Sequence, residues 1–205
     1  MKLSDLFERH YRNLPAYQTA KAAFEPTTNP ELTSKERRIA GDAGLDKFNA
    51  YMDENGFKQL GQGAFGAVYE KPGYPWVFKV FNNDPAYLAW INYVANNQSN
   101  EHVPKIKGKP FRINDGVFAV RMEKLSPFRD SPIADAVLYG QTNEYNKENL
   151  TRLGHTDVIP VLNAIQHLAY GDLTKDWRVD LHIGNVMMRG DIPVITDPIV
   201  DRTAF

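Results

Sequence analysis

The chain has 205 residues, a hydrophobic fraction of 42% and a formal net charge of −1. This length and composition are typical of a globular protein with a real core, and they exclude a wholly disordered chain. The near-zero charge gives no overall attraction to nucleic acid or to an anionic membrane, so neither is expected as a direct partner. Cysteine is absent, which excludes disulfides, a thiolate nucleophile and zinc–thiolate sites.

The amino terminus carries Asp5, Glu8 and Arg9 where a signal peptide would need an apolar core. No apolar run approaches the length of a membrane-spanning helix. We therefore expect a cytoplasmic protein with no membrane partner.

Residues 1–50 are predicted to form a helical extension. Apolar residues from Leu3 to Leu14 recur at helical spacing. Thr33 and Glu36 have the spacing of a capping box, which predicts the start of a second helix.

From about Phe57 the pattern changes to short strands. The segments FKQLGQ, AVYEKP and PWVFKVF are predicted as strands. Asp84 followed by Pro85 is a helix-start signal, and the helix is expected to end near Asn96. Two more strands, PFRIND and GVFAVRMEKL, complete a sheet-rich lobe expected at 51–125.

Residues 126–205 are predicted to be mainly helical. The clearest helix runs from about Thr156 to about Tyr170, with Pro160 in its permissive first turn. Further along, the apolar pieces VMM and VIT flank a Gly-Asp turn, which predicts a small hairpin with polar residues at both ends.

A glycine-rich segment, GQGAFGAV at residues 61–68, lies between the first two predicted strands. Alone, G-x-G-x-x-G is a weak signal, and a glycine-rich hairpin turn explains it equally well. A dinucleotide-binding fold would need a helix after the glycines, whereas a strand follows here, as in the phosphate-covering loop G-x-G-x-x-G-x-V.

Lys79 lies between apolar residues in the strand after this loop. A buried lysine is costly unless it is paired, although a lysine that extends from an edge strand to water is the alternative. Its position beyond the last glycine suits a lysine that reaches the α- and β-phosphates of a nucleotide.

The segment DLHIGN contains Asp180 and Asn185, and Asp197 follows across the predicted hairpin. Phosphoryl transfer depends on positioning and charge neutralisation. Asp180 would orient or accept the proton of an incoming hydroxyl, while Asn185 and Asp197 would hold Mg²⁺ through oxygen. Each residue alone could serve only a turn, but their order after the loop and Lys79 favours one shared site.

The ordered set GQGAFGAV, VFKV, RMEKL, DLHIGN and ITDP resembles the protein kinase superfamily. The DLHIGN form is also similar to aminoglycoside and other small-molecule phosphotransferases. From about residue 45 to the end, the chain further resembles the early Ser/Thr protein kinases of short-tailed lytic bacteriophages. The resemblance implies an α+β, protein-kinase-like bilobal fold, with an N-lobe at 51–125 and a truncated helical C-lobe at 126–205.

The same resemblance implies ATP and Mg²⁺ as cofactors and assigns roles by position. The implied catalytic residues are Asp180, Lys79 and His182, and the implied metal ligands are Asn185 and Asp197. His182 stands where these kinases usually carry a lysine, so it would either contact the γ-phosphate or only pack. The implied nucleotide-binding residues are Gly61, Gly63, Ala64, Phe65, Gly66, Val68, Lys79, Met122 at the back of the adenine pocket, and Glu123 and Leu125 at the hinge.

Several positions depart from the usual kinase pattern. No glutamate lies between Asp84 and Asn100, where the helix partner of Lys79 would be expected, so the identity of any acidic partner stays open. The sequence ends soon after Asp197, without a conventional activation segment. A platform for a peptide substrate would have to come from residues 126–155, the first 50 residues, a partner or a second copy, unless the chain is truncated.

The expected function is phosphorylation of serine or threonine in host proteins, in the host cytoplasm. By resemblance, the targets are transcription or RNA-processing machinery. The alternatives are a small-molecule phosphotransferase and a pseudokinase that binds and inhibits a host partner. The substrate, the oligomeric state and the mode of regulation stay open.

The five histidines show no tight metal-ligand spacing, so they are interpreted as surface or packing residues and no zinc site is expected. Trp76, Trp90 and Trp177 are likewise interpreted as packing residues.

Overall fold

The computed structural model describes residues 49–202, with the exception of 51, 64–65, 83, 115–116 and 140–143. Nearly all of the predicted extension at 1–50 therefore lies outside the described residues, as do Ala64 and Phe65. Residues 49–50 and 52–54 are helical and precede the first strand.

The described residues divide into two compact units. The first contains the residues up to 82 together with Lys107–Met122, and the second contains Asp84–Ile106 and the residues from 123 onward. The sequence predicted a boundary near residue 125, so Asp84–Ile106 falls in the other unit from the predicted one. The reason is that the helix in this segment buries its apolar side chains against helices and strands of the second unit.

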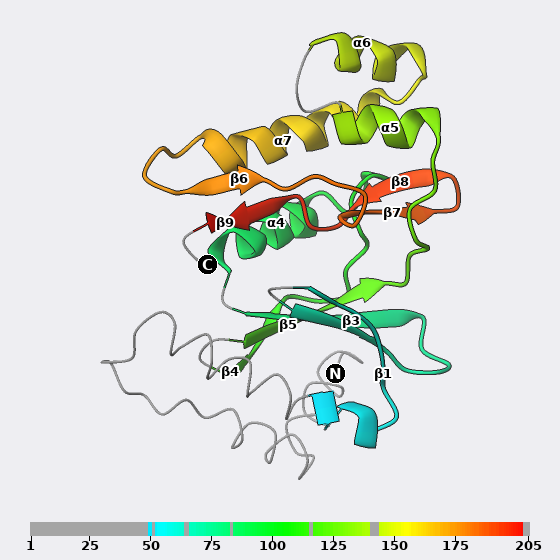
Figure 1. The fold of residues 1–205 in the computed structure, drawn as a ribbon, viewed down its shortest axis with the longest axis vertical. Coiled ribbons are helices and arrows are strands. Elements are labelled where there is room, and N and C mark those ends of the chain that lie inside the picture. Colours follow the sequence, from blue (N-terminus) through cyan, green and yellow to red (C-terminus); the bar gives the residue numbers. More distant parts are fainter. Residues whose placement is uncertain are drawn as a thin grey trace. The chain divides into compact units, whose positions relative to one another are not determined.

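The first unit is a five-stranded sheet in the order β1-β2-β3-β5-β4 (Figure 1). β1 (Lys58–Gly63), β2 (Gly66–Glu70) and β3 (Trp76–Asn82) form successive antiparallel pairs. β4 (Phe111–Asn114) pairs antiparallel with β5 (Val117–Glu123). All five strands correspond to predicted ones, and β2 to β5 carry the β-branched and aromatic residues that favour strands.

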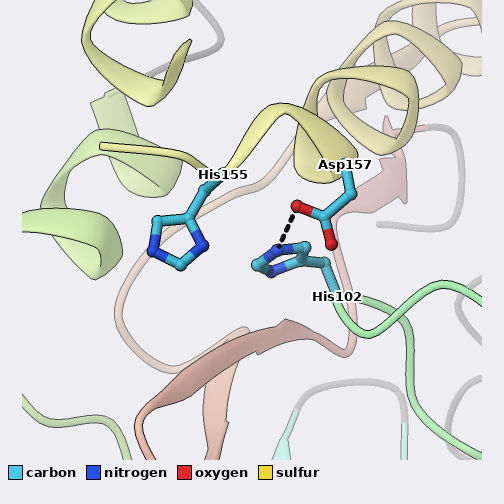
Figure 2. Close-up of side chains that lie close together, drawn as sticks. All are labelled: His102, His155 and Asp157. Atoms are coloured by element: carbon cyan, nitrogen blue, oxygen red, sulfur yellow. Dashed lines mark ion pairs between the residues drawn. The ribbon is translucent and has the colours of Figure 1, made fainter. Parts of the chain in front are cut away.

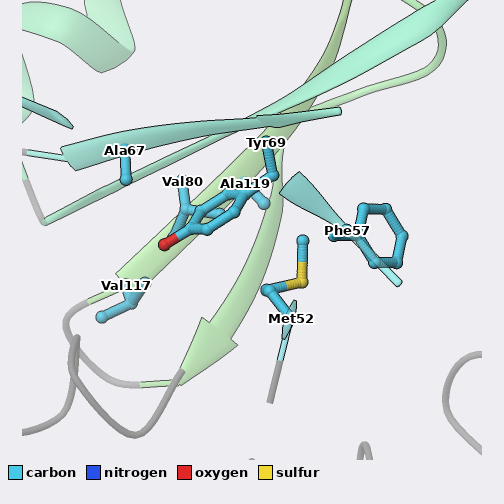
Figure 3. Close-up of a cluster of buried hydrophobic side chains, with 7 residues drawn as sticks. All are labelled: Met52, Phe57, Ala67, Tyr69, Val80, Val117 and Ala119. Atoms are coloured by element: carbon cyan, nitrogen blue, oxygen red, sulfur yellow. The ribbon is translucent and has the colours of Figure 1, made fainter. Parts of the chain in front are cut away.

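A buried apolar cluster lies against one face of this sheet (Figure 3). Tyr69 is central to it: burial raises the pKa of its phenol to about 12, and its hydroxyl donates to the side chain of Asn49. The rings of Phe57 and Phe78 meet edge to face with centroids 5.5 Å apart. The buried members are Met52, Phe57, Ala67, Tyr69, Val80, Val117 and Ala119.

The second unit contains helices α4 (Pro85–Asn96), α5 (Pro132–Tyr139), α6 (Glu144–Arg152) and α7 (Ile159–Tyr170). A 3₁₀ turn, η1 (Thr156–Val158), precedes α7, so the predicted helix begins with a tighter turn. The apolar face of α7 buries Val161, Leu162, Ile165 and Ala169. None of the helices in the described part of the chain combines the length and apolarity that crossing a membrane would need.

Two small ladders complete the second unit. β7 (Val186–Arg189) and β8 (Ile192–Ile195) form the predicted hairpin around Gly190. β6 (Trp177–Val179) pairs with β9 (Ile199–Asp201), which the sequence did not predict. In Figure 1, α4 lies beside β9 and α7 beside β6. This arrangement brings the segment between β6 and β7 next to the segment between β8 and β9.

Candidate active site

The DLHIGN segment forms a tight loop between β6 and β7. The backbone N–H of Asp180 donates to the Pro198 carbonyl at 2.8 Å, which ties the loop to the start of β9. The amide Nδ2 of Asn185 donates to Asp180 twice, to the main-chain carbonyl at 2.6 Å and to Oδ2 at 3.1 Å. Since Nδ2 faces Asp180, the acceptor Oδ1 of Asn185 lies on the other side of the amide, where a cation could use it.

The ring of His182 closes over the same loop. Its Nδ1 accepts the backbone N–H of Gly184 at 3.0 Å. Nε2 is 3.8 Å from Asp180 Oδ2 and 3.0 Å from Asn185 Nδ2. A Cβ at Gly184 would lie 2.8 Å from His182 Cε1, so glycine is what allows the ring to fold back here. The result is an imidazole ring that lies beside the Asp180 carboxylate and the Asn185 amide.

Asp197 is fixed relative to Asn185 through its neighbour Thr196. The backbone N–H and the Oγ1 hydroxyl of Thr196 both donate to the Asn185 carbonyl, at 2.9 and 3.0 Å. The indole Nε1 of Trp90 on α4 donates to the Thr196 carbonyl at 3.2 Å. Main-chain and buried side-chain bonds therefore set the spacing of the two predicted metal ligands.

Asp84 adds a buried carboxylate to this region. Its side chain caps α4 by accepting the N–H groups of Ala86 and Tyr87, at 2.8 and 3.1 Å. Its pKa is raised to about 6, mainly by burial and to a smaller extent by the negative charges of Asp197 and Asp201, while the two N–H bonds lower it. Neighbouring carboxylates of this kind attract a cation. Sequence reasoning found only the capping role, because nothing local indicates that Asp84 lies near Asp197.

The predicted hinge is organised by a charge pair that the sequence did not indicate. The backbone N–H of Glu123 donates to the Lys105 carbonyl at 2.9 Å. This N–H is therefore already used, and a nucleobase at the hinge would hydrogen-bond the Glu123 carbonyl oxygen. The Glu123 carboxylate accepts from Arg189 on β7, with Nε to Oε2 at 2.9 Å and a second contact from Nη2 to Oε1. Arg189 also donates to the carbonyls of Glu101 and Val103. This arginine joins the hinge to the hairpin that precedes Asp197.

In the first unit, the predicted phosphate-binding glycines lie on an exposed strand. All residues of β1 are exposed, and Gly61 and Gly63 pair with Val68 and Gly66 on β2. Val68 in turn lies opposite Lys79 on β3. The β-sheet register thus brings the glycines, Val68 and the lysine onto three adjacent strands.

The three glycines differ in whether the surrounding structure leaves room for a larger residue. A Cβ at Gly66 would lie 2.1 Å from the Val80 carbonyl oxygen, so β2 could not approach β3 with any larger residue. At Gly61 and Gly63 no described atom lies within 4 Å of an added Cβ. Packing explains Gly66, whereas the other two leave open space above their backbone.

The predicted site residues therefore fall into two sets. The structure brings Asp180, His182, Asn185 and Asp197 together in the second unit, which also contains Glu123 and Leu125. The first unit contains the glycines, Val68, Lys79 and the buried Met122. Ala64 and Phe65 lie outside the described residues.

Comparison with known proteins identifies a family. The family model described as bacteriophage T7 protein kinase 0.7 matches residues 19–201. Among solved structures, the chain is similar to Rad53 1-466 in complex with AMP-PNP (20% identity, TM-score 0.37, covering 74% of this chain and 42% of that one). It is also similar to the Cydia pomonella granulovirus kinase PK-1 (14% identity, TM-score 0.39, 74% and 57%). The chain spans less than two thirds of either structure, and a search of curated proteins found no match.

Proposed function

The chain belongs to the bacteriophage T7 protein kinase 0.7 family, and on that premise we propose that it is an ATP- and Mg²⁺-dependent Ser/Thr protein kinase. The observation that carries the proposal is the set of hydrogen bonds that joins Asp180, Asn185 and Thr196, the neighbour of Asp197. A proton acceptor beside two oxygen ligands is the arrangement that phosphoryl transfer to a hydroxyl requires.

The chemistry of the donor set fits magnesium. Asn185 and Asp197 offer an amide oxygen and a carboxylate, which are the ligands that this hard cation prefers. The nearby carboxylates of Asp84 and Asp201 add negative charge. When bound, Mg²⁺ would neutralise charge on the β- and γ-phosphates of ATP.

The proposed transfer uses the chain's own groups as follows. A substrate hydroxyl oxygen attacks the γ-phosphorus, the bond from that phosphorus to the leaving oxygen of ADP breaks, and the hydroxyl proton passes to the Asp180 carboxylate. The ring of His182, beside Asp180, would contact a γ-phosphate oxygen. The resemblance to protein kinases assigns phosphate binding to Lys79, Gly61 and Gly63.

We further propose that the substrates are host proteins, among them transcription or RNA-processing factors. Family membership supports this part of the proposal, since a phage kinase is made in the host cytoplasm and meets host proteins there. No residue in the described part of the chain selects one such target over another.

The test is labelling of a bacterial lysate with γ-labelled ATP and Mg²⁺, comparing wild type with Asp180→Ala and with Asp191→Ala. Asp191 is a fully exposed aspartate on the hairpin turn and serves as the matched control. We expect label on serine or threonine for wild type and Asp191→Ala, and a loss of about 10²-fold or more for Asp180→Ala.

Other outcomes would replace the proposal. Label confined to the small-molecule fraction indicates a small-molecule phosphotransferase. Label on tyrosine alone removes the Ser/Thr assignment. The absence of any Asp180-dependent transfer, together with retention of one host protein, indicates a pseudokinase.

A further inference from the structure

Two histidines and an aspartate, none of them a predicted catalytic residue, converge in the second unit. His102 follows α4, whereas His155 and Asp157 lie at the start of η1. One ligand atom from each side chain lies within 4.8 Å of the other two. Figure 2 shows the three side chains pointing toward one another. The sequence analysis predicted no metal site here, because the fold brings His102 to His155 and Asp157 across more than 50 residues.

His102 is held in one orientation. Its side chain is 1% exposed, and its Nδ1 lies 2.8 Å from the Pro193 carbonyl oxygen. Because a carbonyl only accepts, Nδ1 carries a proton. In the neutral ring, Nε2 then presents a lone pair, and this atom is 3.3 Å from Asp157 Oδ1.

The Nε2 lone pair of the neutral ring and the Asp157 carboxylate are two potential ligand atoms that lie side by side, and a cation bound by both groups would satisfy them. An imidazole whose other nitrogen donates to a backbone carbonyl has the support that metal-binding histidines usually have.

The backbone around the cluster is pre-arranged by one side chain. Asn100 donates through Nδ2 to the Asp157 carbonyl at 2.6 Å, and its Oδ1 accepts the backbone N–H of His102 at 2.8 Å. His155 is the residue before η1, yet its side chain makes no capping bond there. Its ring stands edge-on to that of His102, with centroids 6.2 Å apart. The backbone positions of His102 and Asp157 are therefore linked through Asn100, while the side chains of His155 and Asp157 keep room to move.

We propose that His102 Nε2, a ring nitrogen of His155 and the Asp157 carboxylate bind a divalent transition-metal ion, of which Zn²⁺ fits this donor set best. Two imidazoles and one carboxylate form a three-ligand zinc site with a further position for water. Zinc bonds of about 2.0–2.1 Å at tetrahedral angles place two ligand atoms about 3.4 Å apart, so ligand atoms that now lie up to 4.8 Å apart must approach by about 1.4 Å. Exposed Asp157 and half-buried His155 can make that movement.

The proposed ion would support the hairpin of the active site. His102 accepts the backbone N–H of Ile195 at 2.9 Å, and its ring binds the Pro193 carbonyl. Both partners belong to β8, the strand that leads to Asp197. An ion at His102 would thus connect η1 to that strand, which is a structural role distinct from phosphoryl transfer.

The experiment uses the full chain after treatment with a chelator, titrated with Zn²⁺ or Co²⁺ in excess Mg²⁺ so that oxygen sites are already filled. Bound metal is measured by mass spectrometry, Co²⁺ absorption reports ligand geometry, and thermal unfolding reports stabilisation. The variants are His155→Ala and Asp157→Asn, with the exposed His167→Ala on α7 as the control.

We expect wild type and His167→Ala to bind one equivalent of Zn²⁺, with a rise in Tm of about 5–10 °C at a hundredfold excess over Kd. His155→Ala and Asp157→Asn should lose both effects. If wild type takes up no more metal than His155→Ala, or if Zn²⁺ shifts all four proteins equally, the proposal is wrong. The contact between His102 and Asp157 is then an ion pair with imidazolium.

Discussion

The glycine-rich strands and the catalytic loop with its hairpin are held in different ways. β1 is exposed along its whole length, and Gly61 and Gly63 meet no described side chain that would exclude a larger residue. In the loop, by contrast, Asp180 and Asn185 are tied to each other and to the β8–β9 segment through backbone and side-chain bonds. Packing within the protein does not explain why residues 61 and 63 are glycine, so a bound ligand is the expected reason. In the loop, contacts within the protein hold the functional residues in position.

The largest effect on stability is expected from Arg189→Ala, which removes the ion pair between Glu123 at the hinge and Arg189 on the β7–β8 hairpin. Arg189 and Glu123 have side chains that are 26% and 17% exposed, and the variant would leave the carboxylate without its partner. We expect a loss of about 3 kcal/mol in the free energy of unfolding, measured by urea titration. Arg178→Ala is the control, since its pair with Asp176 is about 44% exposed on both sides and should cost at most about 1 kcal/mol. Equal losses of stability for the two variants would show that the partly buried ion pair contributes no more than the exposed one.

The next effect concerns Asp84, whose native pKa of about 6 lies above its ordinary value of 3.8. Between these values the native state binds a proton that the unfolded state does not, so stability falls as pH rises from about 4 to about 6. A shift of about two units corresponds to at most about 3 kcal/mol.

Asp84→Asn keeps an oxygen to cap α4 but cannot ionise. Relative to wild type, its free energy of unfolding should therefore increase between pH 4 and pH 7 by up to that amount. Denaturant unfolding at several pH values measures the difference. Parallel stability curves for the two proteins would show that Asp84 titrates normally.

The smallest expected effects on stability come from replacing Gly66, which is tightly packed, and Gly63, which is not. Gly66→Ala should destabilise the chain by about 1–3 kcal/mol, because its Cβ would overlap the Val80 carbonyl. Gly63→Ala meets open space at negative φ and should be neutral or stabilising by less than about 1 kcal/mol. Both variants are expected to bind ATP more weakly, as measured by calorimetry. If Gly63→Ala were the more damaging to folding, packing would explain that glycine as well.

Local signals in the sequence predicted much of this fold. Asp84 followed by Pro85 marked the start of α4, and the Asp84 side chain does cap it. Alternating residues predicted the strands of the first unit, and the Gly-Asp turn predicted the β7–β8 hairpin. In these cases the signal and the structure involve the same short segment.

Pairings between distant segments could not be predicted. β6 and β9 have three residues each, too few for an alternating pattern to be recognised. Nor does any local feature connect Glu123 with Arg189, or His102 with Asp157. The order of the motifs was enough to propose Asp180, Asn185 and Asp197 as one site, but the contacts that support them depend on the three-dimensional fold.

The most direct test of the account is single-turnover phosphoryl transfer by Asp180→Asn, with the Kd for Mg·ATP measured in parallel. Asn keeps the volume of the side chain but cannot accept a proton as the carboxylate does. We predict a Kd within a few-fold of wild type and a transfer rate lower by about 10²–10⁴-fold. Transfer at the wild-type rate would contradict the assignment of Asp180 as the group that accepts the hydroxyl proton.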